Sequence, residues 1–230
     1  LSFIRNKSSN IEIGAMTRAR AIEGDHLIGL HVPMLRIATT QIAHLPIRSR
    51  GTIGGSLANA DPAAEYPAVA LALNMDLVVQ SVGGERRIAA KDFFLDSLTT
   101  ALAPNELLTK IIVPKIPKGS GFAFIEIARR RGDFAIAGVA TQLTLSGKNV
   151  KTVSLALFGV GPVPTRLVAA ERIILRDGIN DKAIKAAAIA VEDEIDPIGD
   201  LHATAEYRRR LAGVICKRAL KQAVSNARNA

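Results

Sequence analysis

The sequence predicts an α+β protein in two parts, and three observations lead to this prediction. Helix-like and strand-like segments alternate along residues 1–113. Two prolines and a glycine in residues 114–119 then interrupt the chain, because such residues neither continue a strand nor begin a helix. Beyond them, strand-like runs joined by a short turn predict an antiparallel sheet, and helical stretches follow. We therefore expect a first domain over residues 1–114 and a second over residues 119–225.

The first domain is expected to begin with a strand that leads to a helix. Residues 11–14 alternate as in a short strand, and Thr17 is placed to cap a helix over residues 18–23. Apolar side chains in residues 33–43 recur at helical spacing, which predicts a second helix. That helix delivers the chain to a glycine-rich loop at residues 51–55.

A helix and a hairpin are expected after this loop. Asp61 can cap the helix, and Pro62 can occupy its first position. Residues 77–79 read as a buried strand, which turns at Gly83-Gly84 and pairs with residues 87–89. These are the alternating elements of an α+β or α/β layer.

The remaining elements follow from the same signals. Residues 92–94 begin a short helical piece, and residues 106–113 make the last strand of the first domain. In the second domain the turn at residues 146–149 separates two of the three expected strands, which are residues 122–127, 135–145 and 150–158. Three expected helices complete the chain, over residues 166–175, 182–191 and 205–224.

The last helix carries many basic residues. Its apolar face is marked by Tyr207, Leu211, Val214 and Ile215. The basic side chains, Arg208 among them, lie mostly elsewhere on the helix, so we expect them to face solvent.

The cysteine and histidine content excludes several kinds of site. The single Cys216 cannot form an internal disulfide, and this chain alone cannot ligate an iron–sulfur cluster, which needs about four thiolates. The four histidines show no paired ligand spacing, so we expect no metal site.

Hydropathy and charge narrow the class further. No apolar run is long enough to span a membrane and no secretory signal begins the sequence, so we expect a cytoplasmic protein. The net charge is +9, but only 4% of the residues are aromatic and the basic residues are scattered. Solvated surface explains this charge better than nucleic-acid binding, with acidic partner subunits or anionic ligands as the next explanation.

The most specific stretch is Arg50–Pro67, which reads RGTIGGSLANADPAAEYP. It closely resembles the second flavin-binding signature, TIGGS followed by DPAAE, of the medium (FAD-binding) subunit of molybdenum hydroxylases of the carbon monoxide dehydrogenase and xanthine dehydrogenase family. Three other stretches resemble the family in the family's order: IGAMT at 13–17, IRSR at 47–50 and RRRGD at 129–133.

The resemblance runs from Leu1 to about Ala223. It implies the C-terminal part of a two-layer FAD-binding domain of the PCMH type, followed by a smaller domain of antiparallel sheet and helices. Relatives carry an earlier glycine-rich loop that nothing in this sequence matches. We therefore expect the chain as given to bind FAD weakly or not at all, and a version extended at its N-terminus to bind it well.

The chemistry of the signature suits a dinucleotide, which needs dispersed phosphate charge and acceptors for sugar hydroxyls. The expected donors for the phosphates are the backbone amides of Thr52, Ile53, Gly54 and Gly55. The hydroxyl groups of Thr52 and Ser56 are expected to add to them. Asp61 and Glu65 would be repelled by the phosphates, so they are expected to accept hydrogen bonds from hydroxyl groups.

The resemblance implies further roles, each beside a plainer alternative. Glu65 stands where relatives usually carry an Asp that contacts the flavin's sugar-alcohol chain; it is otherwise a solvated helix carboxylate. Leu108 matches a position that packs near the isoalloxazine ring; it is otherwise a core leucine. Asp133 and Phe134 lie in a segment that approaches the flavin from the second domain, and some relatives have Tyr where Phe134 stands. On residues alone this segment is a charged turn.

The implied function is electron transfer within an oxidoreductase. A large partner subunit oxidises the substrate at molybdopterin, 2Fe–2S clusters on a small iron–sulfur subunit relay the electrons, and FAD on this chain passes them to an acceptor. The expected assembly is a dimer of such heterotrimers. No Ser-His-Asp, Cys-His or paired-carboxylate motif indicates hydrolysis.

Two alternatives stay open at this point. One is a stand-alone FAD-dependent reductase, such as an enolpyruvyl-UDP-glucosamine reductase, although its catalytic acid and substrate-phosphate residues are not evident here. The other is a non-catalytic assembly subunit without flavin.

Overall fold

Two antiparallel sheets organise the chain, and the computed structural model describes residues 1–229. The first sheet has the strand order β1 (Ile4–Asn6), β2 (Asn10–Gly14), β7 (Leu107–Pro114), β3 (Asp76–Ser81) and β4 (Gly84–Ala89). The second has the order β11 (Thr165–Arg166), β10 (Asn149–Phe158), β9 (Ala137–Ser146) and β8 (Ser120–Ile127). All neighbouring strands pair antiparallel, so the predicted α+β class is confirmed.

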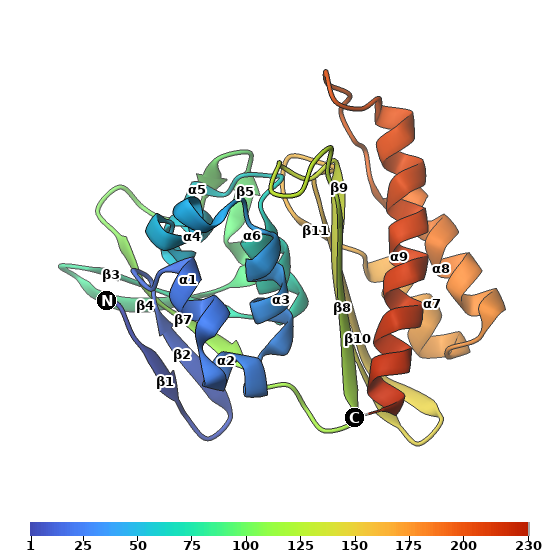
Figure 1. Cartoon of the computed structure of the whole chain (residues 1–230), viewed down its shortest axis with the longest axis horizontal. Coiled ribbons are helices and arrows are strands. Elements are labelled where there is room, and N and C mark those ends of the chain that lie inside the picture. The colour runs from blue at the N-terminus through green and yellow to red at the C-terminus, as the bar shows by residue number, and fades with distance from the viewer. Residues whose placement is uncertain (230) are drawn as a thin grey trace.

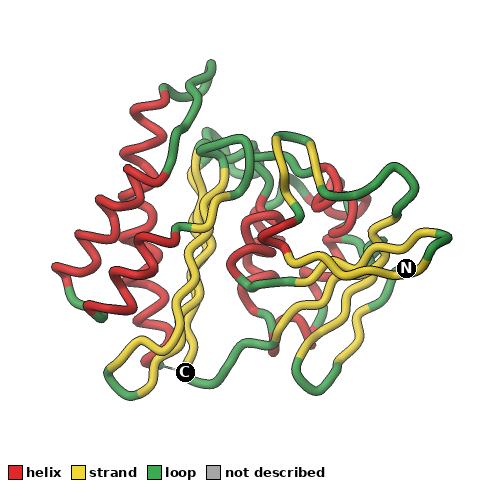
Figure 2. Tube along the Cα trace, turned by 180° about the vertical axis from the view of Figure 1, so that it is seen from behind, coloured by secondary structure: helices red, strands yellow, loops and turns green. Residues whose placement is uncertain are grey.

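Helices fill the space between the sheets and cover the far side of the second one (Figure 1). The inner helices are α1 (Ala19–Gly24), α2 (His26–His31), α3 (Pro33–Gln41), α4 (Leu45–Arg50), α5 (Ile53–Asn59) and α6 (Glu65–Ala72). The outer helices are α7 (Val168–Asp177), α8 (Asp181–Glu194) and α9 (Ala205–Arg228). Figure 2 shows the same layers from behind. Between β4 and β7 lie a short 3₁₀ turn, η1 (Ala90–Asp92), and a small hairpin of β5 (Phe94–Asp96) and β6 (Thr99–Thr100).

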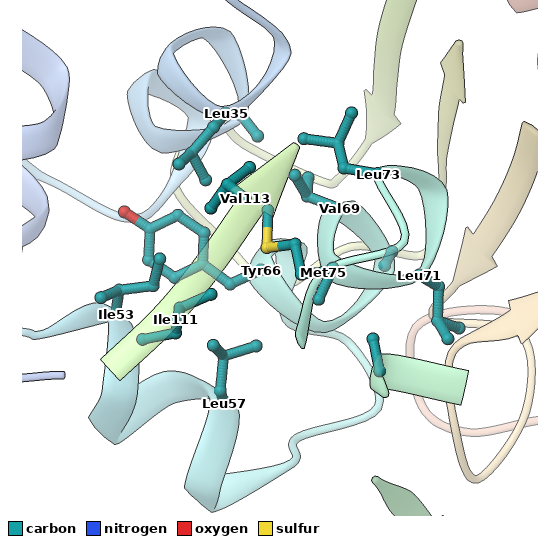
Figure 3. Close-up of a cluster of buried hydrophobic side chains, with 14 of the residues drawn as sticks. Leu35, Ile53, Leu57, Tyr66, Val69, Leu71, Leu73, Met75, Ile111 and Val113 are labelled. Atoms are coloured by element: carbon teal, nitrogen blue, oxygen red, sulfur yellow. The ribbon is translucent and has the colours of Figure 1, made fainter. Parts of the chain in front are cut away.

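The core of the first layer forms around α6, all eight residues of which are buried. Tyr66 lies among aliphatic side chains from α3, α5 and β7 (Figure 3), and its hydroxyl group is 3.0 Å from the Thr39 hydroxyl. Burial raises the pKa of the Tyr66 phenol. This hydrogen bond satisfies the one polar atom that the ring brings into the core.

The two layers share one hydrophobic core. Phe124 and Phe158 from the second sheet stack with their ring centroids 5.6 Å apart, and both belong to the cluster that contains Tyr66. The buried Ser154 hydroxyl donates to the Ala72 carbonyl at the end of α6 over 2.6 Å. The junction between the layers is therefore packed and hydrogen-bonded.

Two predicted helix caps are wrong. Arg18, not Thr17, is the N-cap of α1, because the Thr17 hydroxyl exchanges hydrogen bonds of 3.1 Å with the Phe3 backbone. Helix α6 begins at Glu65 rather than after Asp61, whose side chain accepts from the Ala63 amide in a tight turn. The Pro62 carbonyl is not available to a helix, because it accepts a hydrogen bond from the Gly159 amide.

Four short segments also differ from expectation. The glycines of the signature lie inside helix α5 rather than in a loop. Residues 92–94 end a 3₁₀ turn and enter strand β5 instead of starting a helix. Helices α2 and α4 have no counterpart among the predicted elements, since six residues are too few to display helical periodicity.

The buried face of α9 is only partly the predicted one. Ile215 is buried and Leu211 packs against the same core, but Tyr207 is 51% exposed and Val214 44% exposed, whereas Arg208 is only 6% exposed. Small residues on the buried face let α9 approach the second sheet closely, and a Cβ on Gly121 would lie 1.9 Å from the Ala223 carbonyl oxygen. This close approach favours a buried face on which alanines and a glycine alternate with larger residues such as Ile215 and Leu220. None of the helices within residues 1–229 is both long and apolar enough to cross a bilayer.

Candidate functional site

The glycine signature forms the start of helix α5, which abuts the end of strand β2. Thr52 is the N-cap, and its hydroxyl accepts from the Gly55 amide over 3.1 Å. The Gly54 amide donates to the Ala15 carbonyl over 2.9 Å, and the Ile53 amide donates to the Thr17 carbonyl over 3.1 Å. Three of the four amides predicted to bind phosphates therefore already donate hydrogen bonds to other groups of the chain. The Thr52 amide has no such acceptor within residues 1–229.

The two glycines serve different purposes. A Cβ on Gly54 would lie 2.5 Å from the Ala15 Cβ, so Gly54 is needed for packing α5 against β2. Gly55 is exposed, and a Cβ there would approach only the Thr52 hydroxyl, at 2.8 Å. Gly55 therefore leaves the outer surface of the helix bare beside that hydroxyl.

The outer surface of α5 suits an anionic group. Thr52, Gly55, Ser56 and Asn59 are half or fully exposed, and their spacing puts them on one face of the helix. Two exposed arginines adjoin the start of this face, where the Arg18 guanidinium donates to the Arg50 carbonyl. Hydroxyl groups, one amide and guanidinium groups are the donors that phosphate binds in proteins.

A cavity of about 870 Å³ lies where the two layers meet, beyond the C-terminal end of α5. Its walls come from residues 61–63, 132–136, 159, 161–162 and 198–200, together with Ser97, Arg129, His202 and Arg208. The predicted site residues Asp61, Asp133 and Phe134 all line it. The Phe134 ring is 71% exposed, so an aromatic surface is available to a ligand.

Two predicted residues lie away from this cavity. Leu108 is in the core of the first layer, where it pairs with Val79 across β3 and β7, which is the plainer position that the residues alone left open. Glu65 is buried in the first turn of α6.

A second carboxyl group, that of the half-buried Glu126 on β8, was missed by the sequence analysis. Burial raises the pKa of Glu65 to about 7, and the Asp61 charge adds to this. Burial also raises the pKa of Glu126 to about 8, and the Glu65 charge adds to it. The Glu126 Oε2 atom is buried and has no hydrogen-bond partner within residues 1–229. Glu126 follows Phe124 by two residues on strand β8, so the two side chains lie on the same, inward face of the sheet. This spacing is the signal in the sequence that could have identified Glu126.

Arg208 is the other residue that was missed, because its helix face was expected to be solvated. Its guanidinium donates to the Ile136 carbonyl at 2.6 Å, the Gly159 carbonyl at 2.7 Å and the Asp200 carboxylate at 2.6 Å. Amide donation from His202, with help from Arg208, lowers the pKa of Asp200 to about 2. Arg208 thus ties together three segments of the cavity wall.

Comparison with known proteins assigns the chain to a family. Residues 1–116 match the family described as "FAD binding domain in molybdopterin dehydrogenase", and residues 122–223 match "CO dehydrogenase flavoprotein C-terminal domain". The chain is 38% identical to the 6-hydroxypseudooxynicotine dehydrogenase complex subunit alpha of Paenarthrobacter nicotinovorans, over 99% of this chain and 77% of that protein. It is 34% identical to the glyceraldehyde dehydrogenase medium chain of Sulfolobus acidocaldarius, over 96% of this chain and 79% of that one.

Solved structures agree with this assignment. Carbon monoxide dehydrogenase from Hydrogenophaga pseudoflava contains a chain that superimposes with a TM-score of 0.96 at 35% identity, over 98% of this chain and 78% of that chain. The resemblance of the TIGGS and DPAAE motifs is thereby confirmed as kinship over the whole fold. The chain belongs to the FAD-binding medium subunits of the molybdenum hydroxylases, of the carbon monoxide dehydrogenase type.

Proposed function

We propose that this chain carries FAD and transfers electrons within a molybdenum hydroxylase. The observation that carries the proposal is the outer face of α5, where hydroxyl groups and a bare glycine lie beside two exposed arginines and lead toward the cavity. FAD, when bound, accepts two electrons and can release them one at a time.

The residues of α5 divide into those that bind and those that support. The Thr52 and Ser56 hydroxyls and the Thr52 amide would bind phosphate oxygens, and Gly55 would give them room. Ile53 and Gly54 would instead hold the helix in place, since their amides and surfaces are committed to the end of β2.

The acidic residues beyond α5 would hold the sugar-alcohol part of the cofactor. Asp61 lines the cavity, and Glu65 lies a few residues further at the start of α6. Both would accept hydrogen bonds from hydroxyl groups, because a phosphate beside either carboxylate would be repelled.

The cavity would receive the ring system. Phe134 supplies an aromatic wall and Asp133 a carboxylate at the rim. Leu108, which lies on β7 in the core of the first layer, would not touch the ring from this cavity. Arg208 would keep this wall in place without touching the ring, because its donors are directed to the chain's own carbonyls.

Other subunits must bring the electrons. The single cysteine of the chain, Cys216, is buried inside α9, and burial raises the pKa of its thiol. We therefore place the 2Fe–2S clusters on a small iron–sulfur subunit and substrate oxidation on a large molybdopterin subunit, in a dimer of heterotrimers. In this proposal residues 1–114 form the FAD-binding domain and residues 119–225 the C-terminal domain.

Gly55→Val tests the phosphate surface in the complex assembled with its partner subunits. The added side chain would meet the Thr52 hydroxyl and cover the bare surface. Flavin content, measured by absorbance after denaturation and normalised to iron, should fall at least tenfold. Gly24→Val is the matched control, because Gly24 is an exposed helix residue whose Cβ would meet nothing within 4 Å.

The outcomes separate the alternatives. Full flavin content in the Gly55→Val complex would reject the phosphate surface. A wild-type complex that contains iron and molybdenum but no flavin would instead indicate the non-catalytic assembly subunit. A lone chain that oxidises an organic substrate would indicate the stand-alone reductase.

A further inference from the structure

The segment between helices α8 and α9 has no regular secondary structure, yet it forms one wall of the cavity. It spans residues 195–204, and in Figure 1 it projects beyond the upper end of the second sheet. Four of its residues line the cavity: Ile198, Gly199, Asp200 and His202. We call residues 198–202 the outer wall. The segment is anchored just before this wall, because Ile195 is buried in the core beneath the outer helices.

A chain of hydrogen bonds joins the outer wall to the flavin-binding signature. The Asp200 carboxylate accepts from the Arg208 guanidinium over 2.6 Å, and the same guanidinium donates to the Gly159 carbonyl over 2.7 Å. The Gly159 amide in turn donates over 2.8 Å to the carbonyl of Pro62, which follows Asp61 in the signature. All five of these residues line the cavity. The hydrogen bonds therefore fix the outer wall relative to the first layer.

Two features leave this chain of hydrogen bonds little freedom. Gly159 has a φ of +73°, and a Cβ there would lie 2.9 Å from the Ala135 carbonyl oxygen, so the position requires glycine. Asp200 also accepts from the amides of His202, over 2.8 Å, and Ala203, over 3.0 Å. Chiefly through the His202 amide, these bonds lower the pKa of Asp200 to about 2. The carboxylate therefore stays charged and bonded throughout the neutral range.

A second aspartate of the same segment shows how an ordinary surface ion pair differs from this one. Asp196 pairs with Arg209 over 3.2 Å, but its side chain is fully exposed and lies outside the cavity. Asp200 pairs instead with Arg208, whose side chain is only 8% exposed. Exposed ion pairs contribute little, whereas a buried guanidinium that loses one acceptor is costly. Asp200 is therefore the aspartate that can hold the segment in one conformation.

The outer wall also presents an apolar side chain to the cavity. Ile198 is 76% exposed and lines the cavity, as does Phe134, which is 71% exposed. Leu201, three residues further on, is fully exposed but is not among the lining residues. Binding sites for ring systems are lined mainly by apolar side chains, with a few polar groups that fix orientation. Ile198 meets this description, and Leu201 does not.

We propose that Ile198 is a further contact of the flavin ring and that Asp200 is the positioning residue that holds Ile198 at the cavity. The inference rests on the proposed function, which places the ring system in this cavity. Asp200 acts through the segment, because its bonds to Arg208 and to two amides keep the outer wall in one conformation. Loss of its charge would free the outer wall and admit water to the ring, and the phosphate surface on α5 would stay intact.

The first test uses the assembled complex with its flavin bound and compares Asp200→Asn with Asp196→Asn. We follow FAD release by flavin fluorescence, and the surroundings of the ring by the visible circular dichroism of the bound flavin. Asp200→Asn should release FAD about tenfold faster than wild type and weaken the visible dichroism, because a charged hydrogen bond is lost. Asp196→Asn should stay within about twofold of wild type, because it removes only an exposed pair.

The second test addresses the contact itself. Ile198→Ala and Leu201→Ala each shorten an exposed side chain of the same segment, so neither should alter the thermal midpoint appreciably. Ile198→Ala should release FAD about fivefold faster, since apolar contact with the ring is lost, and Leu201→Ala should match wild type. Because Asp200 acts through Ile198, the double variant Asp200→Asn/Ile198→Ala should release FAD no faster than Asp200→Asn alone.

The outcomes separate this inference from the function on which it rests. Equal release from Asp200→Asn and Asp196→Asn, or multiplied rates in the double variant, would overturn the positioning role. Release from Ile198→Ala at the wild-type rate would overturn the ring contact. If Asp200→Asn does not assemble, Asp200→Glu replaces it, since the longer side chain displaces the segment and should also speed release. A wild-type complex without flavin would overturn the proposed function, and this inference with it, before any variant is compared.

Discussion

The two faces of the second sheet bury charge in opposite ways. Beneath the outer helices, Glu171 is buried but accepts from the Leu155 amide over 2.7 Å and pairs with the Arg166 guanidinium. Arg208 is equally buried and donates to two carbonyls and a carboxylate. On the inner face, Glu65 is buried and the Oε2 atom of the half-buried Glu126 has no hydrogen-bond partner within residues 1–229.

This difference distinguishes buried charged groups that stabilise the fold through their partners from buried carboxyl groups that lack such partners. A buried ion that has its partners stabilises the fold only while the set is complete, and removing one partner is costly. A buried carboxyl without partners lowers stability, so it has a role only if something else, such as a proton or a ligand hydroxyl, completes it. The outer face thus secures the second sheet, and the inner face is the candidate for binding.

Arg208→Met should show the largest effect and would test the outer side of the comparison. It removes the donors to the Ile136 and Gly159 carbonyls, and we expect the free energy of unfolding to fall by about 3 kcal/mol in urea denaturation. Arg210→Met is the control on the same helix, since Arg210 is exposed, and it should cost less than about 0.5 kcal/mol. Equal effects of the two variants would remove Arg208 from its structural role.

Glu171→Gln should cost less and would sharpen the comparison directly. The amide keeps one acceptor for Leu155 but loses the charge that faces Arg166, so we expect a loss of about 2 kcal/mol in unfolding free energy at pH 8. The same glutamate-to-glutamine change at Glu126 should raise stability at that pH. If the two variants changed stability in the same direction, the distinction between the two faces would fail.

Phe134→Ala should have the smallest effect on stability and a clear effect on the ligand. Because the ring is 71% exposed, unfolding free energy should change by less than about 0.5 kcal/mol. FAD should nevertheless dissociate several-fold faster from the assembled complex, as measured by fluorescence. Val82→Ala, at the exposed tip of the β3–β4 hairpin, should leave the flavin unaffected. Unchanged dissociation in Phe134→Ala would remove the ring from the proposed site.

Local signals accounted for much of the fold. The hairpin turn at Gly83-Gly84 and the strands on either side of residues 146–149 form as predicted, because turn residues and alternation act over a few neighbouring positions. Helix caps at Thr17 and Asp61 failed for the opposite reason. Both side chains had other partners available, the Phe3 backbone and the Ala63 amide, and those hydrogen bonds were formed instead.

The candidate site was only partly accessible from the sequence. Asp61 meets Asp133 and Phe134 at one cavity although it lies far from them in the chain, and the family resemblance pointed to all three. The motif did not reveal that three of its four amides are already bonded within the chain. That depends on where strand β2 ends, which no local pattern around residue 52 contains.

The sequence by itself determined the α+β class, the antiparallel sheet of the second domain and the kinship with FAD-binding medium subunits, because each rests on short-range patterns or on a contiguous motif. Only the tertiary structure decided that Arg208, Glu65 and the Oε2 atom of Glu126 are buried. Burial and coupling are set by what packs against a side chain from elsewhere in the chain. Here that is the close approach of α9 to the second sheet and of α6 to the junction, where the cost of an unpaired charge appears only after both layers have come together.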